Sequence, residues 1–148
     1  MGKTIIHGFI VGAMAVLVFH QGTVLLLSQL GSASPVLASI FGPTGAPFNL
    51  APVKPLGVPM IVSQAFWGGL WGSVLVLILV LARPPDLLFG FVFGAVVLTL
   101  VAVTVVASLK GLPIFGGGNR TVWIRAILLN GAWGWGTALL LRSSVSRG

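Results

Sequence analysis

The chain has 148 residues, of which 57% are hydrophobic and only 6% are charged, and its formal net charge is +7. A soluble globular domain carries about 25% charged residues, so this composition excludes a water-facing surface of the usual kind and most of the surface must face lipid or other proteins. Cysteine is absent, which excludes disulfides and cysteine-based metal sites, and the single acidic residue is Asp86.

The near absence of carboxylates limits the chemistry that the chain can perform. Proton relays and cation sites in membranes are usually built on carboxylates, and hydrolases need a carboxylate, a metal or an activated nucleophile. We therefore expect no enzyme activity, no catalytic residue and no metal site. The Lys and Arg residues fall mostly at the ends of apolar runs and form no basic stripe, so nucleic acid is not an expected partner.

The apolar runs predict an all-α polytopic membrane protein, with a single transmembrane domain over residues 1–148 and a four-helix bundle. The predicted helices cover residues 4–30, 60–82, 87–109 and 121–141. The first run follows Lys3 and is too long for the apolar region of a typical signal peptide, so we interpret it as an uncleaved helix.

Residues 31–59 are the long connection between the first two predicted helices. This segment holds six of the nine prolines, which argues against a continuous helix. Its only charged residue is Lys54, whereas a disordered linker would be rich in charge. We therefore expect an ordered, partly extended loop that lies over the bundle or against a partner, with a short helix at Val36–Phe41.

Each predicted helix carries two small residues four positions apart, a spacing that lets another helix approach closely. These helix-packing pairs are Gly8 and Gly12, Gly68 and Gly72, Gly90 and Gly94, and Ala132 and Gly136. The sequence around Trp135 and Gly136 is similar to that around Trp71 and Gly72. An old duplication of a helical hairpin is therefore a further hypothesis.

Four tryptophans lie within the second and fourth helices, at Trp67, Trp71, Trp133 and Trp135. Large rings beside glycines favour knob-and-groove packing between these two helices. Contact with lipid, quinone, carotenoid or another pigment is the alternative, and the sequence leaves both interpretations open.

The end of the first helix and the starts of the second and fourth share one side of the membrane. At 1.5 Å per residue this places five polar residues in one leaflet, roughly 6–14 Å inside the helix ends. The five residues of this predicted polar cluster are His20, Gln21, Gln64, Arg125 and Asn130. Three interpretations are open: these residues form hydrogen bonds between helices, bind a small molecule or lipid headgroup, or act as cofactor ligands.

Among the two histidines, His20 is the better candidate ligand for a haem or pigment, because Gly22 beside it leaves room for a ring. His7 lies close to the headgroups and is interpreted as a solvated end residue. No cofactor is predicted from these residues alone.

The basic residues split evenly between the two sides. The terminal side has Lys3, Arg83, Arg142 and Arg147, and the other has Lys54, Lys110, Arg120 and Arg125. The positive-inside rule therefore does not decide the orientation. Because a long proline-rich loop is more natural outside, we predict cytoplasmic termini in a bacterial inner membrane.

Three stretches carry a resemblance to known sequences: residues 19–21 (FHQ), 51–59 (APVKPLGVP) and 63–72 (SQAFWGGLWG). They resemble a family of small uncharacterised bacterial four-helix integral membrane proteins. The resemblance covers roughly the first half of the chain. No activity is attached to that family. The resemblance therefore implies the class of protein but identifies no functional residue.

The leading hypothesis is a non-catalytic accessory or structural subunit of a larger membrane complex, respiratory or photosynthetic, in contact with lipids and other subunits. It rests on the missing catalytic groups, the small-residue pairs and the apolar loop. A small oligomeric transporter or channel for a neutral or anionic solute, lined by the polar cluster, is the alternative. A protein that binds pigment or haem through His20 is the second alternative.

Overall fold

The computed structural model describes residues 1–145. Within that part of the chain, four helices are long and apolar enough to cross a membrane, which confirms the prediction of an integral membrane protein. These spans are Gly2–Ala33, Met60–Ala82, Asp86–Leu109 and Arg120–Arg142. The first span begins earlier and ends later than the predicted residues 4–30, because no proline or charge interrupts it after Lys3.

Two of the four spans contain π-helical segments. The first span consists of α1 (Gly2–Ala15), the π-helical segment η1 (Val16–His20) and α2 (Gln21–Ala33). The third consists of α5 (Asp86–Val92), η2 (Phe93–Leu98), α6 (Thr99–Val101), η3 (Ala102–Val106) and α7 (Ala107–Leu109), with η2 and η3 in the π conformation. The second and fourth spans are the uninterrupted helices α4 (Met60–Ala82) and α8 (Arg120–Val145).

The connection between the first two spans is partly structured. A short helix, α3 (Pro35–Phe41), begins after Ser34, whose hydroxyl accepts a hydrogen bond from the backbone N–H of Leu37. Proline at the first helical position favours such a start because it lacks only an N–H that would be unpaired there anyway. Further along, β1 (Pro52–Val53) and β2 (Val58–Pro59) form a two-stranded antiparallel hairpin.

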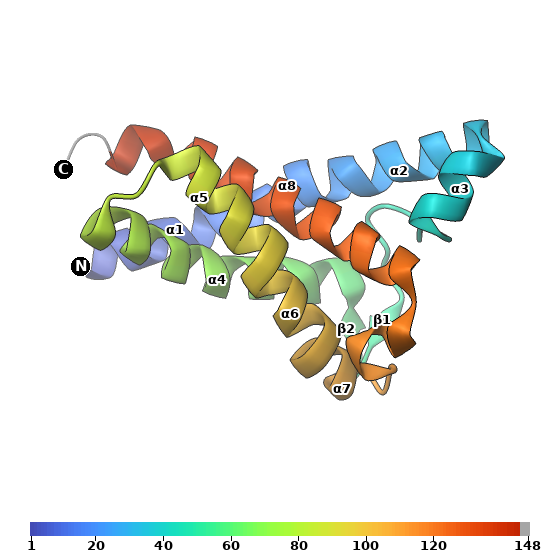
Figure 1. The fold of residues 1–148 in the computed structure, drawn as a ribbon. Coiled ribbons are helices and arrows are strands. Elements are labelled where there is room, and N and C mark those ends of the chain that lie inside the picture. Colours follow the sequence, from blue (N-terminus) through green and yellow to red (C-terminus); the bar gives the residue numbers. More distant parts are fainter. Residues whose placement is uncertain (146–148) are drawn as a thin grey trace.

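Helix α1 packs along α4 through glycines on both helices (Figure 1). A Cβ on Gly12 would collide with the backbone carbonyl oxygen of Gly68, and a Cβ on Gly72 with that of Gly8. Only glycine leaves room for this approach, so backbone touches backbone. We call this the α1–α4 glycine contact.

A second close contact joins α5 and η2 to α8. Added Cβ atoms at Gly90 and Gly94 would strike the backbone of α8, at Gly134 and Asn130 respectively. The predicted fourth-helix pair, Ala132 and Gly136, is therefore not the pair at this contact. Gly136 instead leaves room for the ring of Phe19 in η1, on another face of α8.

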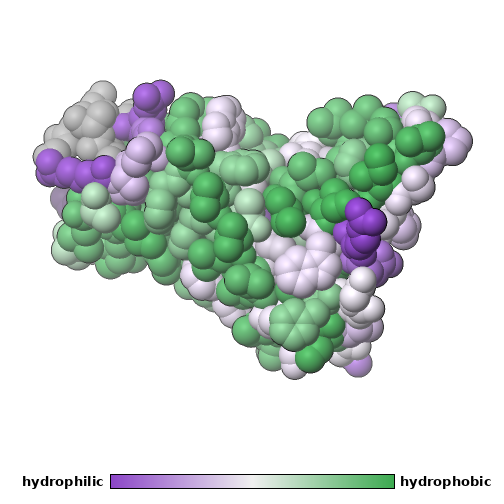
Figure 2. All heavy atoms as spheres, viewed as in Figure 1, coloured by the Kyte–Doolittle hydropathy of each residue, from purple (hydrophilic) through white to green (hydrophobic). Residues whose placement is uncertain are grey.

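The two helix pairs lie together near the chain termini and diverge at the opposite end. The start of α1 and the end of α8 lie at the same end of the molecule, whereas α2 with α3 and α6 with α7 extend in different directions at the other (Figure 1). At the terminal end Arg142 forms an ion pair with Asp86, with 3.1 Å between Nε and Oδ2. Apolar side chains cover most of the visible face, as expected for a surface in lipid (Figure 2).

Trp133 on α8 is the largest fully buried side chain and links the two helix pairs. Its indole N–H donates a hydrogen bond of 2.9 Å to the backbone carbonyl of Gly12. The ring also packs in the apolar core with Val16, Leu75 and Leu98. The α1–α4 glycine contact thus also leaves the Gly12 carbonyl accessible to the Trp133 indole, which it positions.

We predict that Gly12→Ala destabilises the protein. The added methyl group meets the Gly68 carbonyl, and overpacking of this kind costs about 1–3 kcal/mol. The midpoint of unfolding in mixed detergent micelles measures the effect. Gly22→Ala on the same span is the matched control, because a Cβ there meets no atom within 4 Å. Equal midpoints for the two variants would contradict the packing argument.

Candidate functional site

A cavity of about 180 Å³ lies between the diverging ends of the helices. It is bounded by η1, α4, the η2–η3 part of the third span with Lys110 after it, and α8. The lining residues are Val16, His20, Ser63, Gln64, Trp67, Gly68, Trp71, Leu98, Val101, Ala102, Val106, Lys110, Asn130 and Trp133. We call this space the inner cavity.

A second cavity of about 350 Å³ adjoins the inner cavity beneath the β1–β2 hairpin. The two cavities share four lining residues, Ser63, Trp67, Val106 and Lys110. The remaining walls of this outer cavity are mostly apolar and come from the hairpin, α4 and α7. The outer cavity thus lies on the loop side of the protein, and the inner cavity reaches the buried Trp133.

The π-helical segments supply much of the wall from the first and third spans. Val16 and His20 belong to η1, Leu98 to η2, and Ala102 and Val106 to η3. A π-helical turn contains an extra residue, so it rotates the side chains that follow relative to a regular α-helix. Such segments occur frequently at functional sites.

Gln21 is the centre of the hydrogen-bond network beside the inner cavity. It is only 3% exposed, and its Oε1 accepts a hydrogen bond of 2.7 Å from the backbone N–H of Phe48. Its Nε2 donates to Gln64 Oε1 at 2.8 Å and lies 3.3 Å from His20 Nδ1. The network thereby connects the long loop, the first span and α4.

The N–H of Phe48 fixes the direction of every hydrogen bond in this network. A backbone N–H can only donate, so the Gln21 atom that it contacts must be the oxygen and the other must be the nitrogen. The Gln21 nitrogen then donates to Gln64 Oε1 and to His20 Nδ1. Consequently the proton of a neutral His20 ring resides on Nε2, and the NH₂ group of Gln64 points away from Gln21.

Lys110 adds a positive charge to the wall shared by both cavities. Burial lowers the pKa of its ammonium group from the ordinary lysine value, because the charged form loses contact with water. The one acidic side chain of the sequence, Asp86, is paired with Arg142 at the opposite end of the spans. The inner cavity therefore presents hydrogen-bond donors and positive charge, with no carboxylate side chain.

The structure divides the predicted cluster of five polar residues. His20, Gln21 and Gln64 form one network, and Asn130 lines the same cavity while its Nδ2 donates to Thr99 Oγ1 at 3.2 Å. Arg125 does not line this cavity. Its guanidinium donates to the backbone carbonyls of Phe41 and Pro43, both at 2.9 Å, and so fastens the end of α3 to α8.

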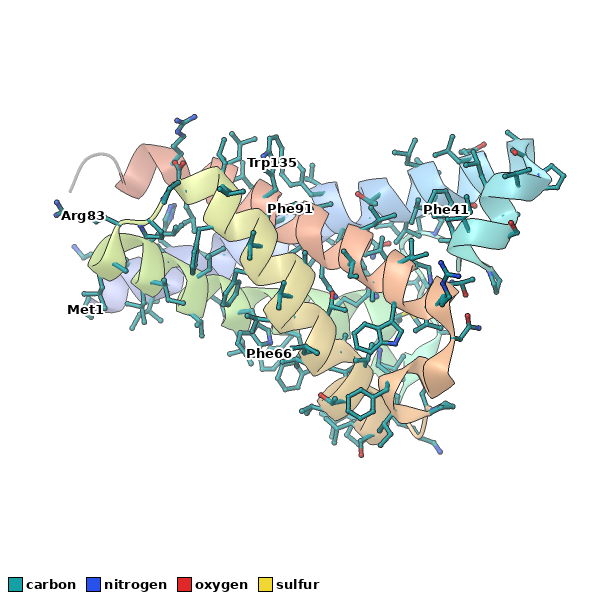
Figure 3. All side chains as sticks on the ribbon, in the orientation of Figure 1. Met1, Phe41, Phe66, Arg83, Phe91 and Trp135 are labelled. Atoms are coloured by element: carbon teal, nitrogen blue, oxygen red, sulfur yellow. The ribbon has the colours of Figure 1, made fainter. Side chains whose placement is uncertain are left out.

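Three of the four predicted tryptophan contacts lie at the inner cavity, namely Trp67, Trp71 and Trp133. Trp135 is 39% exposed and contacts Phe19 edge-on, with ring centroids 5.9 Å apart. Figure 3 shows it on the outer side of α8. The expected packing between the second and fourth helices therefore involves Trp133, whereas Trp135 faces outward.

Sequence reasoning overlooked Lys110, Phe48 and Ser63 as parts of the site. Lys110 could have been predicted from the sequence, because it follows the third span on the same side as the polar cluster. Phe48 acts only through its backbone N–H, which leaves no trace in the side-chain pattern.

The volume of the inner cavity bears on whether a haem or flat pigment could lie beside His20. Pockets for drug-sized ligands measure about 300–1,000 Å³, and the inner cavity at about 180 Å³ is smaller. Within residues 1–145 there is also no group of three or more His, Asp or Glu side chains that could hold a metal ion. A narrow molecule that continues into the outer cavity matches the space better.

Comparison with known proteins finds no match to a family model, to a curated protein or to a solved structure. The functional argument therefore rests on the geometry of the two cavities.

We predict that Arg125→Gln loosens α3 from α8 without opening the cavities. Hydrogen bonds from charged donors are worth about 1.5–3 kcal/mol, so amide hydrogen exchange at residues 38–42 is expected to rise by about tenfold or more. Hydrogen exchange with mass spectrometry measures this. Arg120→Gln, at an exposed position on the same helix, is the control. Unchanged exchange in Arg125→Gln would show that these two bonds do not hold α3.

Proposed function

We propose that the protein is a non-catalytic membrane protein that takes up an amphipathic molecule from the bilayer into the inner and outer cavities. The observation that carries the proposal is the meeting of three indole rings with a fixed set of hydrogen-bond donors in one cavity. Ligand sites are typically apolar and aromatic with a few placed polar groups, and this cavity has that composition.

The cost of polar groups in a membrane supports a binding role. Polar side chains within spans are expensive and usually face a partner or a cavity. A purely structural network would pair its polar groups with one another. Here Gln21 is fully paired, while the NH₂ of Gln64 and the Nε2–H of His20 have no such protein acceptor among the described residues.

We further propose a bacterial inner membrane as the location, with both termini cytoplasmic and the four spans associated as a bundle. The long loop, with α3 and the β1–β2 hairpin, would then lie on the outer side. The hairpin on that side lines the outer cavity, so the ligand would enter from the outer leaflet.

We predict that Ala102→Phe blocks binding by filling the inner cavity, which Ala102 lines. Native mass spectrometry from membrane vesicles measures the mass of lipid-like molecules that stay bound. Val105→Phe on the same π-helical segment is the matched control, because Val105 is 53% exposed on the outer surface. Bound molecules should disappear in Ala102→Phe and persist in the control. Equal retention in both variants would exclude the cavity as the binding site.

A role as an accessory subunit is the second proposal, and the arm formed by α2 and α3 supports it. The first span has 32 residues, or about 48 Å of helix, whereas a bilayer core is about 30 Å thick. Its later part and α3 carry exposed apolar side chains, at Leu25, Leu26, Val36 and Ile40. These side chains are the surface that another subunit would cover.

We predict that replacing Leu25 and Leu26 together with Ser releases the chain from a larger particle. The native mass of gently solubilised particles from the protein's own membranes is the measurement, and the free chain has a mass of 15.3 kDa. Leu81→Ser is the control, because Leu81 is 70% exposed at the opposite end of the spans. A wild-type particle no heavier than a single chain with its detergent would refute this role.

A further inference from the structure

We propose that the two cavities select a single-chain amphiphile with an anionic carboxylate head, that is, a molecule of the long-chain fatty-acid class. The inference deepens the proposed function and rests on it, because it names the chemical class of the molecule that the cavities take up. Three properties of the site support it: the direction of its hydrogen bonds, its charge and its shape.

The direction of the hydrogen bonds requires an acceptor. Gln64 Oε1 and His20 Nδ1 are both occupied by the Gln21 amide nitrogen, which leaves N–H groups of Gln64 and His20 to meet a ligand. Within the described part of the chain, every side-chain nitrogen or oxygen that is fully buried has a hydrogen-bond partner. These two N–H groups are therefore not fully buried, and both residues line the inner cavity.

The charge of the site favours an anion over a neutral acceptor. Lys110 lines both cavities, Lys54 lines the outer one, and His20 is the other titratable side chain on these walls. A cation in a poorly hydrated wall is stabilised by a counter-charge, and Asp86 is occupied at the far end. A neutral carbonyl would satisfy the N–H groups but would leave this ammonium group without an anion, and a cationic head would be repelled.

The shape of the site favours one chain. The outer cavity shares four lining residues with the inner one and has apolar walls formed by Val53, Leu56, Val62, Phe66 and Leu109. At about 180 Å³ the inner cavity is below the range of about 300–1,000 Å³ for drug-sized sites, and at about 350 Å³ the outer cavity is near its lower end. A carboxylate at Gln64, His20 and Lys110 would therefore place a single acyl chain in the outer cavity.

Quenching of tryptophan fluorescence provides a direct test, because three of the five tryptophans line the inner cavity. The probes are dibrominated stearate, the matching dibrominated stearyl alcohol and the neutral quinone decylubiquinone, each added to the purified chain in lipid nanodiscs. Bromine quenches indoles at close range. Saturable quenching is expected from the stearate, at concentrations at least about tenfold lower than those needed for the alcohol.

Gln64→Glu is the most informative variant. A glutamate can still accept the hydrogen bond from Gln21, so the network stays anchored, but it replaces the NH₂ donor by a carboxylate. The Kd for dibrominated stearate is expected to rise by about tenfold or more in Gln64→Glu and in Lys110→Gln. Arg120→Gln, which removes a positive charge at an exposed position that lines neither cavity, is the control and should alter the Kd by less than about threefold.

The pKa of Lys110 gives a second measurement that does not depend on quenching. An anionic head beside the ammonium group should raise the lowered pKa of Lys110, whereas a neutral ligand should leave it lowered. NMR titration of isotopically methylated lysines, assigned with Lys110→Gln, follows this group.

The possible outcomes separate this inference from the proposed function. Equal affinity for acid and alcohol, or preference for the quinone, would refute selection of a carboxylate while leaving a binding cavity. An unchanged Kd in both Gln64→Glu and Lys110→Gln would also refute it. Absence of saturable quenching by all three probes, in wild type as in Ala102→Phe, would refute the proposed function itself.

Discussion

The α1–α4 glycine contact is the constraint on which the rest of the structure depends. Because Gly8, Gly12, Gly68 and Gly72 lack side chains, two backbones touch and the carbonyl of Gly12 becomes accessible to a third helix. Trp133 donates to that carbonyl, and it also lines the inner cavity. A substitution at this contact would therefore disturb the helix pair and the wall of the candidate site together.

The molecule combines a tightly packed end with an open one. Near the termini, glycine contacts and the ion pair between Asp86 and Arg142 hold the helices together. Toward the long loop, π-helical segments and diverging helices leave the two cavities. Each helical hairpin has its own glycine contact, which is the arrangement that an old duplication of a hairpin would produce.

The Gln21 network shows how a loop determines the chemistry of a cavity that it does not line. One backbone N–H, that of Phe48, sets the orientation of the Gln21 amide. That amide in turn sets the tautomer of His20 and the orientation of Gln64. His20, Gln64 and Lys110 thus supply the inner cavity with hydrogen-bond donors. The fatty-acid proposal follows from these donors more than from the size of the cavity.

The sequence by itself determined the membrane class, the four spans and three of the four small-residue pairs that permit close packing, because hydropathy and glycine spacing are local properties of the chain. It also grouped His20, Gln21 and Gln64, which hydrogen bonds join in the structure. Only the tertiary structure decided that Arg125 fastens α3, that Gly134 replaces Ala132 and Gly136 at the second contact, and that Lys110 joins the cavity. Those outcomes depend on helix rotation and divergence, which π-helical turns alter and which hydropathy does not encode.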